Sequence, residues 1–180
     1  RGHWGAGISL YGTDATIENV LVIGNKKRDG AGTGIGGGIY VSMGDVTIRQ
    51  ATVLGNSQGQ GGGIAHYNSS GDLVVLNSIV SDNDAATGAG IYESCSTCTT
   101  TVTYTDVWPD DVSGVDFTAG SAGNLAADPD FVAWAAGGLW TDQDLGLRSS
   151  SPGVDAGDPS TKDADGTRAD LGFYGGPAGK

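Results

Sequence analysis

The sequence contains few basic residues and no long apolar run. Nine Lys and Arg residues stand against 21 Asp and Glu residues, which gives a net charge of −12. A chain with this charge is repelled by a phosphate backbone, so we expect no nucleic-acid partner. No apolar run approaches the roughly 20 residues that a membrane-spanning helix needs, and residues 1–4 lack the apolar core of a signal peptide. We therefore expect no transmembrane segment, and we expect any targeting segment to lie outside these residues.

The composition of the chain also disfavours helices. Gly accounts for 33 of the 180 residues, and aromatic residues make up only 7%. Each Gly in a helix interior costs roughly 1 kcal/mol relative to Ala, so this composition disfavours long helices. The sequence therefore predicts an all-β chain that is rich in turns.

A repeat is present along the first part of the chain. Four Gly-rich starts each end in an isoleucine, at Ile8, Ile39, Ile64 and Ile91. A segment of alternating apolar and polar residues follows each of the first three starts, which is typical of short strands. Laid in register, these segments give three columns of like residues: Ile17, Ile48 and Val75; Val22, Val53 and Val80; Asn25, Asn56 and Asn83.

Units of this length cannot bury an apolar face alone, so they must stack on one another. Each column then becomes a ladder of like side chains, about 4.8 Å from one layer to the next. We expect the Ile and Val ladders in the interior. The Asn ladder is expected at a turn, where side-chain amides bond to one another and to unpaired backbone groups. The repeat therefore predicts a parallel β-solenoid of about four coils within residues 1–108.

The repeat also resembles a known family. The pattern Gly-Gly-Gly-Ile-Tyr, followed by Val-Thr-Ile and then by the turn Asn, is similar to the right-handed parallel β-helix of the pectate-lyase-like superfamily. Residues 5 to about 108 carry this resemblance. It implies the fold and leaves the activity open, because that fold hosts lyases, hydrolases, adhesins and surface-layer components.

The remainder of the chain loses the periodicity and resembles a second family. Four blocks occur in the order found in the C-terminal segment of bacterial surface proteins of the choice-of-anchor Q type: residues 102–107, 128–131, 151–159 and 163–176. Thr105, Val154 and Phe173 depart from the usual residues of these blocks. The resemblance implies a secreted, extracellular or cell-surface bacterial protein. We expect residues 109–180 to form a loop-rich segment of the cap or anchor type.

The two cysteines, Cys95 and Cys98, lie close together among Ser and Thr residues. A redox motif would need a helix N-terminus to lower the thiol pKa, and a zinc site needs about four ligands. His3 and His66 are the only histidines in the sequence. We favour a structural disulfide, which suits an extracellular location, over reduced thiols or a functional site.

No column of carboxylates suited to catalysis is visible. A β-helix lyase or hydrolase generally needs acidic side chains on neighbouring coils, with Arg or Lys nearby. The outward positions beside the first apolar column hold Glu18 and Arg49, which predict an ion pair between two coils. We therefore assign no catalytic residue, although the sequence leaves open whether the chain is part of an enzyme.

Aspartates gather near the C-terminus. Asp163, Asp165 and Asp170 surround a Gly turn, as oxygen ligands do in a calcium loop. Thr161 and Gly172 stand where such a loop would have further ligands. Calcium is therefore one interpretation. The alternative is a tight turn in which Asp side chains accept backbone hydrogen bonds and Arg168 pairs with one of them.

Two tyrosines are candidates for glycan binding. Tyr40 and Tyr92 follow equivalent isoleucines two coils apart. If both rings point outward, they would stand about 10 Å apart along the solenoid axis and suit stacking on a polysaccharide. The alternative is that they cover a flank of the solenoid or a contact with another protein. The four Trp residues are expected to pack the terminal regions.

The N-terminal coil begins with no covering segment, so we expect a partner chain, a like subunit or further coils at that end. We favour a non-catalytic structural or interaction protein that docks on a protein partner or a surface glycan. One alternative is the C-terminal part of a polysaccharide lyase or hydrolase with its catalytic coils upstream. The other is a calcium-dependent glycan-binding module.

Overall fold

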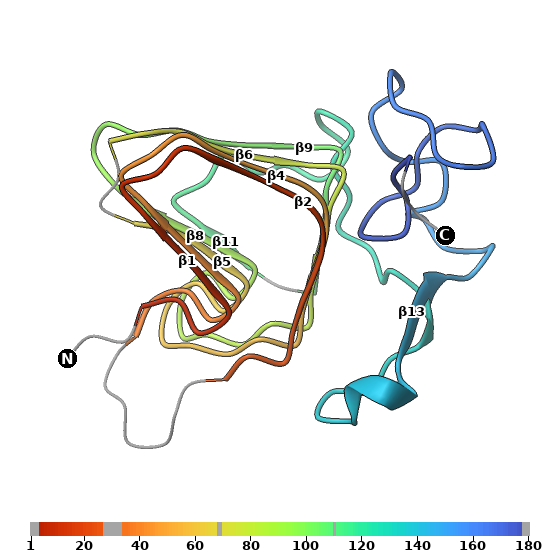
Figure 1. The fold of residues 1–180 in the computed structure, drawn as a ribbon, viewed down its shortest axis with the longest axis horizontal. Coiled ribbons are helices and arrows are strands. Elements are labelled where there is room, and N and C mark those ends of the chain that lie inside the picture. Colours follow the sequence, from red (N-terminus) through yellow and green to blue (C-terminus); the bar gives the residue numbers. More distant parts are fainter. Residues whose placement is uncertain (1–3, 27–33, 68–69, 110, 178–180) are drawn as a thin grey trace.

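The protein is an all-β solenoid in a computed structural model that describes residues 4–26, 34–67, 70–109 and 111–177. Two parallel sheets run along the stack. The first sheet has the order β1 (Ile8–Tyr11), β3 (Ile39–Ser42), β5 (Ile64–Tyr67), β8 (Ile91–Ser94) and β11 (Val112–Ser113). Figure 1 looks nearly along the stack, so that successive layers of each sheet overlap.

The second sheet contains the longest strands, which bend in the middle. Its layers are β2 (Ala15–Ile23), β4 (Val46–Leu54), β6 with β7 (Leu73–Leu76, Ile79–Ser81), and β9 with β10 (Thr100–Thr103, Asp106–Trp108). Four layers are separated by three steps, so the chain makes about three turns, slightly fewer than the four coils expected from the Gly-rich starts.

The predicted columns are confirmed by the strand register. Ile17 pairs with Ile48 and Ile48 with Val75, while Val22 pairs with Val53 and Val53 with Val80. The paired residues of the middle layers are 0% exposed, since they fill the space between the two sheets. Parallel pairing places the same position of each layer at the same place in the core, which explains why like residues recur.

The predicted Asn ladder is also confirmed. The side-chain amide of Asn25 donates to Asn56 Oδ1 at 2.9 Å, and that of Asn56 donates to Asn83 Oδ1 at 3.0 Å. Gly63 shows how closely the neighbouring layers approach there, since a Cβ on it would lie 2.6 Å from the Gly90 carbonyl oxygen and 2.9 Å from the Asn83 amide. The recurring Gly residues therefore make room for the amide ladder.

Residues 111–127 cover the end of the solenoid. Strand β11 adds to β8, and Val115 and Phe117 pack against the apolar core. Leu125 forms a parallel bridge with Asp106, and the side-chain amide of Asn124 donates to the Val102 carbonyl. This segment therefore covers apolar surface at the end of the core and pairs with some of the backbone groups that the last layer presents.

Residues 128–177 follow the flank of the solenoid instead. They begin with an antiparallel hairpin of β12 (Phe131–Ala133) and β13 (Asp144–Leu147), joined through the short 3₁₀ helix η1 (Trp140–Asp142). The backbone amides of Gly172 and Phe173 then donate to the Asn77 carbonyl and to Thr52 Oγ1. Figure 1 shows this blue segment beside the layers.

The first layer is less covered than those behind it. Ile8, Leu10 and Ile17 are only partly buried, whereas Ile39 and Ile48 of the next layer are 0% exposed. This is the face on which we predicted a partner or further coils, and that prediction stays a prediction. Within the part of the chain that the structure describes, no helix has the length and apolarity to cross a membrane.

Candidate functional site

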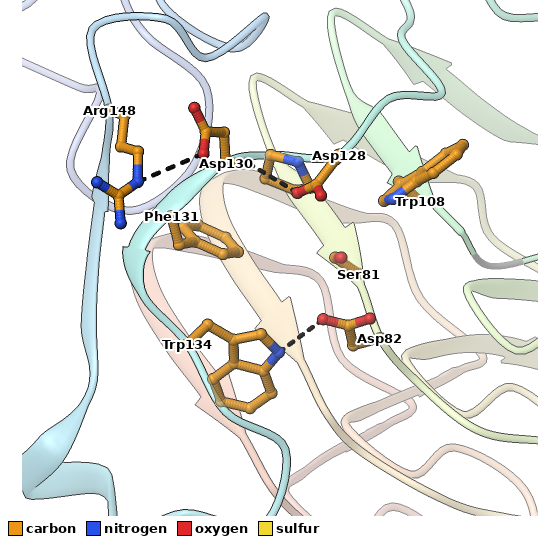
Figure 2. A pocket seen from close by; sticks show the side chains of 9 residues that line it. Ser81, Asp82, Trp108, Asp128, Asp130, Phe131, Trp134 and Arg148 are labelled. Carbon is orange, nitrogen blue, oxygen red and sulfur yellow. Dashed lines mark hydrogen bonds and ion pairs between the residues drawn. The ribbon is translucent and has the colours of Figure 1, made fainter.

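A pocket of about 290 Å³ lies where the flanking segment meets the end of the second sheet. Ser81 of β7 and Trp108 of β10 form the solenoid side, and they are partners in the parallel register. Phe131 and Trp134 form the other side, from the region of the β12 hairpin. Figure 2 shows the aromatic rings on opposite sides of Ser81 and Asp82.

Trp134 is held in place by two contacts with the turns of the solenoid. Its indole Nε1 donates to Asp82 Oδ2 at 2.6 Å. Its ring edge lies against Gly55, where a Cβ would come within 2.8 Å of the indole. Gly55 has a φ of +64° and Asp82 a φ of +52°, so both residues occupy equivalent left-handed turns of successive layers. The turn geometry therefore creates the place where Trp134 packs.

The polar part of the pocket is acidic. Asp82 and Asp128 are exposed, and Asp128 Oδ1 accepts the backbone N–H of Asp130 at 2.9 Å. Arg148 is the one cation among the lining residues, and it is already engaged, because its Nε lies 3.4 Å from Asp130 Oδ1 and its Nη2 donates to the Val132 carbonyl. The pocket therefore carries net negative charge.

A buried carboxyl group, Asp106, lies near this acidic region. It is 1% exposed, and burial is the main cause that raises its pKa to about 6. A hydrogen bond from the Ala127 N–H to Oδ1 at 3.1 Å lowers the pKa, while the charge of Asp128 raises it. Among the described residues, Asp106 Oδ2 has no hydrogen-bond partner. Burial therefore favours the neutral carboxylic acid here more than at an ordinary aspartate, so that Asp106 becomes protonated below about pH 6.

The two tyrosines expected to bind a glycan lie in the same column of the first sheet, but they differ in how far they are buried. Tyr40 pairs with Ala65 and Ala65 with Tyr92, as predicted. Tyr40 is only 1% exposed, and Trp4 stacks on its ring at 5.7 Å between centroids. Tyr92 is partly buried, and its hydroxyl accepts a hydrogen bond from Gln60. The expectation that both rings are open is therefore corrected for Tyr40, which covers the flank.

Two of the three aspartates that the calcium interpretation named accept hydrogen bonds within turns, whereas Asp163 Oδ1 has no hydrogen-bond partner among the described residues. Asp165 Oδ1 accepts the Thr167 N–H, and Asp170 Oδ1 accepts the Asp155 N–H. Hydrogen bonds to Asp165 lower the pKa of its carboxyl, whereas burial and the neighbouring charge of Asp165 raise that of Asp163. Among the described residues, the side chains that gather as a possible metal-binding group are those of His66, Glu93, Cys95 and Cys98, and none of these three aspartates belongs to it. The hydrogen bonds of Asp165 and Asp170 are of the kind that the tight-turn alternative proposed.

The tight-turn alternative had proposed that Arg168 pairs with an aspartate, but among the described residues it forms no such ion pair, although its charge helps to lower the pKa of the Asp158 carboxyl. Its Nε and Nη2 donate to the carbonyls of Gly157 and Ala156. Its guanidinium carbon also lies 5.7 Å from the centre of the Tyr104 ring. Arg168 therefore joins two stretches of the flanking segment, and its contact with Tyr104 also connects that segment to the solenoid.

The cysteines have neighbours that sequence reasoning missed. Cys95 and Cys98 form a disulfide in the structure, with Cα atoms 5.9 Å apart. His66 and Glu93 lie beside them, and His66 is 0% exposed. Burial lowers the pKa of His66, and the Glu93 carboxylate partly opposes this effect. The signal was present in the register, because His66 and Glu93 each follow a column isoleucine by two residues.

Comparisons of the chain with protein-family models, with curated proteins and with solved structures find no match. The class of the protein therefore comes from its fold. The chain is a β-solenoid protein with stacked parallel sheets.

Proposed function

We propose that the protein is a non-catalytic glycan-binding β-solenoid, and that the pocket between the solenoid and the β12 hairpin is its sugar site. The observation that carries this proposal is the placement of Trp108 and Trp134 on either side of the Asp82 carboxylate. Trp108 is 38% exposed. Its exposed surface is available to a ligand.

The chemistry of this arrangement suits a sugar ring. The C–H groups on one face of a pyranose carry partial positive charge and pack against the electron-rich face of an indole. The hydroxyl groups around the ring edge donate to acceptors, and a carboxylate offers several lone pairs for this purpose. A volume of about 290 Å³ suits one or two sugar residues and lies at the lower end for small-ligand pockets.

The negative charge of the pocket limits the kind of glycan that it can bind. Asp82 and Asp128 lie in the pocket, and Arg148 is engaged by Asp130. A polyuronate or a sulfated chain would meet like charge here and across a protein of net charge −12. We therefore propose a neutral or amino-sugar glycan, bound without calcium. The resemblance to bacterial surface β-helix proteins supports an extracellular or cell-surface setting for such binding.

A glycan array followed by titration calorimetry on the best neutral or amino-sugar ligand tests this proposal. Trp108→Ala is expected to weaken binding about fivefold, since stacking on one indole contributes on the order of 1 kcal/mol. Asp82→Asn keeps an acceptor for Trp134 and tolerates the left-handed turn, yet it removes the charge. It is expected to weaken binding several-fold, most of all for an amino sugar.

Matched controls come from the same chain. Tyr11 is 61% exposed on β1, and Asp84 is an exposed acid in the turn after Asp82. Tyr11→Ala and Asp84→Asn should bind as the unchanged protein does. Equal losses in the control and pocket variants, or binding confined to acidic polysaccharides, would refute the assignment of this pocket. Cleavage of the bound glycan by the chain would refute the non-catalytic part.

A further inference from the structure

One inward-facing column of the first sheet changes from apolar to polar along the stack. Leu10 pairs with Val41, Val41 with His66, and His66 with Glu93. Val41 belongs to the apolar core, so the positions that pair with it face the interior too. A buried imidazole and a carboxylate in consecutive layers of a core column need a chemical reason, because an apolar residue would fill the same place without desolvating a polar group.

The corner that follows β8 brings two sulfur atoms to this polar pair. Cys98 Sγ lies 3.5 Å from His66 Nδ1, and Glu93 Oε2 lies 3.9 Å from the same nitrogen. One ligand atom from each of His66, Glu93, Cys95 and Cys98 falls within 4.8 Å of the others. Bonds of about 2.0–2.3 Å to a tetrahedral zinc ion place its ligand atoms roughly 3.3–3.8 Å apart. To reach this geometry the two sulfur atoms, which are bonded to each other in the disulfide, must separate on reduction, while the more distant ligand atoms of the cluster move closer together.

We propose that His66, Glu93, Cys95 and Cys98 form a binding site for a borderline-soft divalent cation of the zinc class when the two cysteines are reduced. Two thiolates, one imidazole and one carboxylate supply four ligands, which is the number that closed zinc sites use. The sulfur and nitrogen atoms select against calcium and magnesium, which prefer oxygen ligands throughout.

The oxidation state of the cysteines controls this site. A thiol reductant supplies two electrons and two protons to the Cys95–Cys98 disulfide, gives two thiols and is itself oxidised to a disulfide. Zinc then replaces the two thiol protons, which are released to solvent, and forms two Zn–S bonds. In the oxidised protein only His66 and Glu93 remain as ligands, so the disulfide form should bind the ion weakly or not at all.

In the metal-free protein, Thr100 forms a hydrogen bond with the histidine of the proposed site. Its Oγ1 lies 2.9 Å from His66 Nδ1, so the two side chains share a hydrogen bond that metal binding must replace. With Nδ1 on the metal, the ring proton resides on Nε2.

Cobalt(II) is the probe that tests this proposal in the intact chain. Under anaerobic reducing conditions we expect one equivalent of cobalt to produce a thiolate-to-metal charge-transfer band and the intense visible bands of tetrahedral cobalt, and zinc to displace it. The protein with its disulfide intact should give neither band. This comparison uses the unchanged sequence, so its result does not depend on whether a variant folds.

The two glutamates of the chain provide a matched pair of variants. Glu93→Gln is expected to weaken cobalt and zinc binding at least about tenfold, since loss of even an outer partner costs that much in metal sites. Glu18→Gln alters an exposed glutamate that pairs with Arg49, and it should bind as the unchanged protein does. Cys98→Ser should remove the charge-transfer band at the concentration that saturates the reduced protein.

Three results would overturn the proposal. The first is a reduced protein that gives no thiolate band with cobalt. The second is equal binding by the oxidised and reduced proteins, and the third is equal affinity of Glu93→Gln and Glu18→Gln for the ion. Sugar binding at the Trp108 pocket involves none of these residues, so either function can fail without the other.

Discussion

Asp106 connects the stability of the protein to pH. Its pKa is 3.8 in an ordinary environment and about 6 in the folded protein, chiefly because the side chain is buried. Between these two pH values the folded state keeps a proton that the unfolded state releases. Stability therefore falls as the pH rises through this interval and stays at the lower level above it.

The Asp106→Asn variant should lose this dependence. An unchanged protein is expected to be less stable at pH 8 than at pH 4.5, with a contribution from Asp106 of about 2 kcal/mol, whereas the variant carries no charge there at either pH. Urea unfolding at the two pH values measures the difference. Asp84→Asn, at an exposed acid, serves as the control. If Asp106→Asn and Asp84→Asn show the same pH dependence, the buried carboxyl does not titrate as described.

Individual residues were predictable where they belong to a column. The ion pair of Glu18 with Arg49, at 2.9 Å, follows from the register that the repeat gives. The burial of Tyr40 could not be predicted from the repeat. The outward side of a strand is covered or open according to which other residues pack on it, and here Trp4 covers the Tyr40 ring. The sequence did not predict a metal-binding role for His66. A histidine and a glutamate alone are too few ligands to indicate a metal site, and only the structure shows that Cys98 lies beside both.

At the scale of the element, the Asn ladder ties the layers together at one corner. Asn56 is 0% exposed, and its amide donates to the Val22 carbonyl and to Asn83 Oδ1. Its own Oδ1 accepts from the backbone and side chain of Asn25. The residue therefore joins three layers through one side chain.

Asn56→Ala is expected to destabilise the fold by about 3 kcal/mol, because it leaves several buried polar groups without partners. Asn25→Ala should cost about 1 kcal/mol, since Asn25 is only partly buried at the end of the ladder. The free energy of unfolding in urea measures both. Losses of equal size would show that position within the ladder does not matter.

Elements were predictable in the solenoid and not beyond it. Parallel stacking places equivalent positions of successive layers in the same environment. An apolar residue such as Ile48 therefore predicts a similar residue, Val75, at the equivalent position of the next repeat. The hairpin of β12 and β13 has no such repeat, and its position depends on single contacts such as Trp134 with Asp82. The candidate sugar pocket arises from that contact, which is why sequence reasoning placed the aromatic site on the tyrosines.

At the scale of the whole molecule, burial rises from the first layer to the middle layers. Ile17 of β2 is partly buried, and its column partner Ile48 is 0% exposed. In a solenoid each layer is stabilised mainly by its neighbours, so a layer covered on one side opens more easily than one covered on both.

Amide hydrogen exchange should therefore be fastest in β2 and slowest in β4 when the 180-residue chain is alone in dilute solution. The expected difference in protection is at least about tenfold for paired positions such as Leu21 and Thr52, which are register partners. Slow exchange in β2 that becomes fast on dilution would reveal a second copy of the chain on this face. Equal, concentration-independent protection would contradict the gradient.

The flanking segment has a consequence for the length of the solenoid. Gly172 bonds to Asn77 while the next residue, Phe173, bonds to Thr52, so two adjacent residues touch two adjacent layers. An extra layer inserted between β4 and β7 would separate these anchors by a further 4.8 Å or so and break one of them. The same layer added before β2 would leave both intact. The protein can therefore gain repeats before β2 during evolution or engineering, while the spacing between the β4 layer and the layer of β6 and β7 is fixed by the segment alongside.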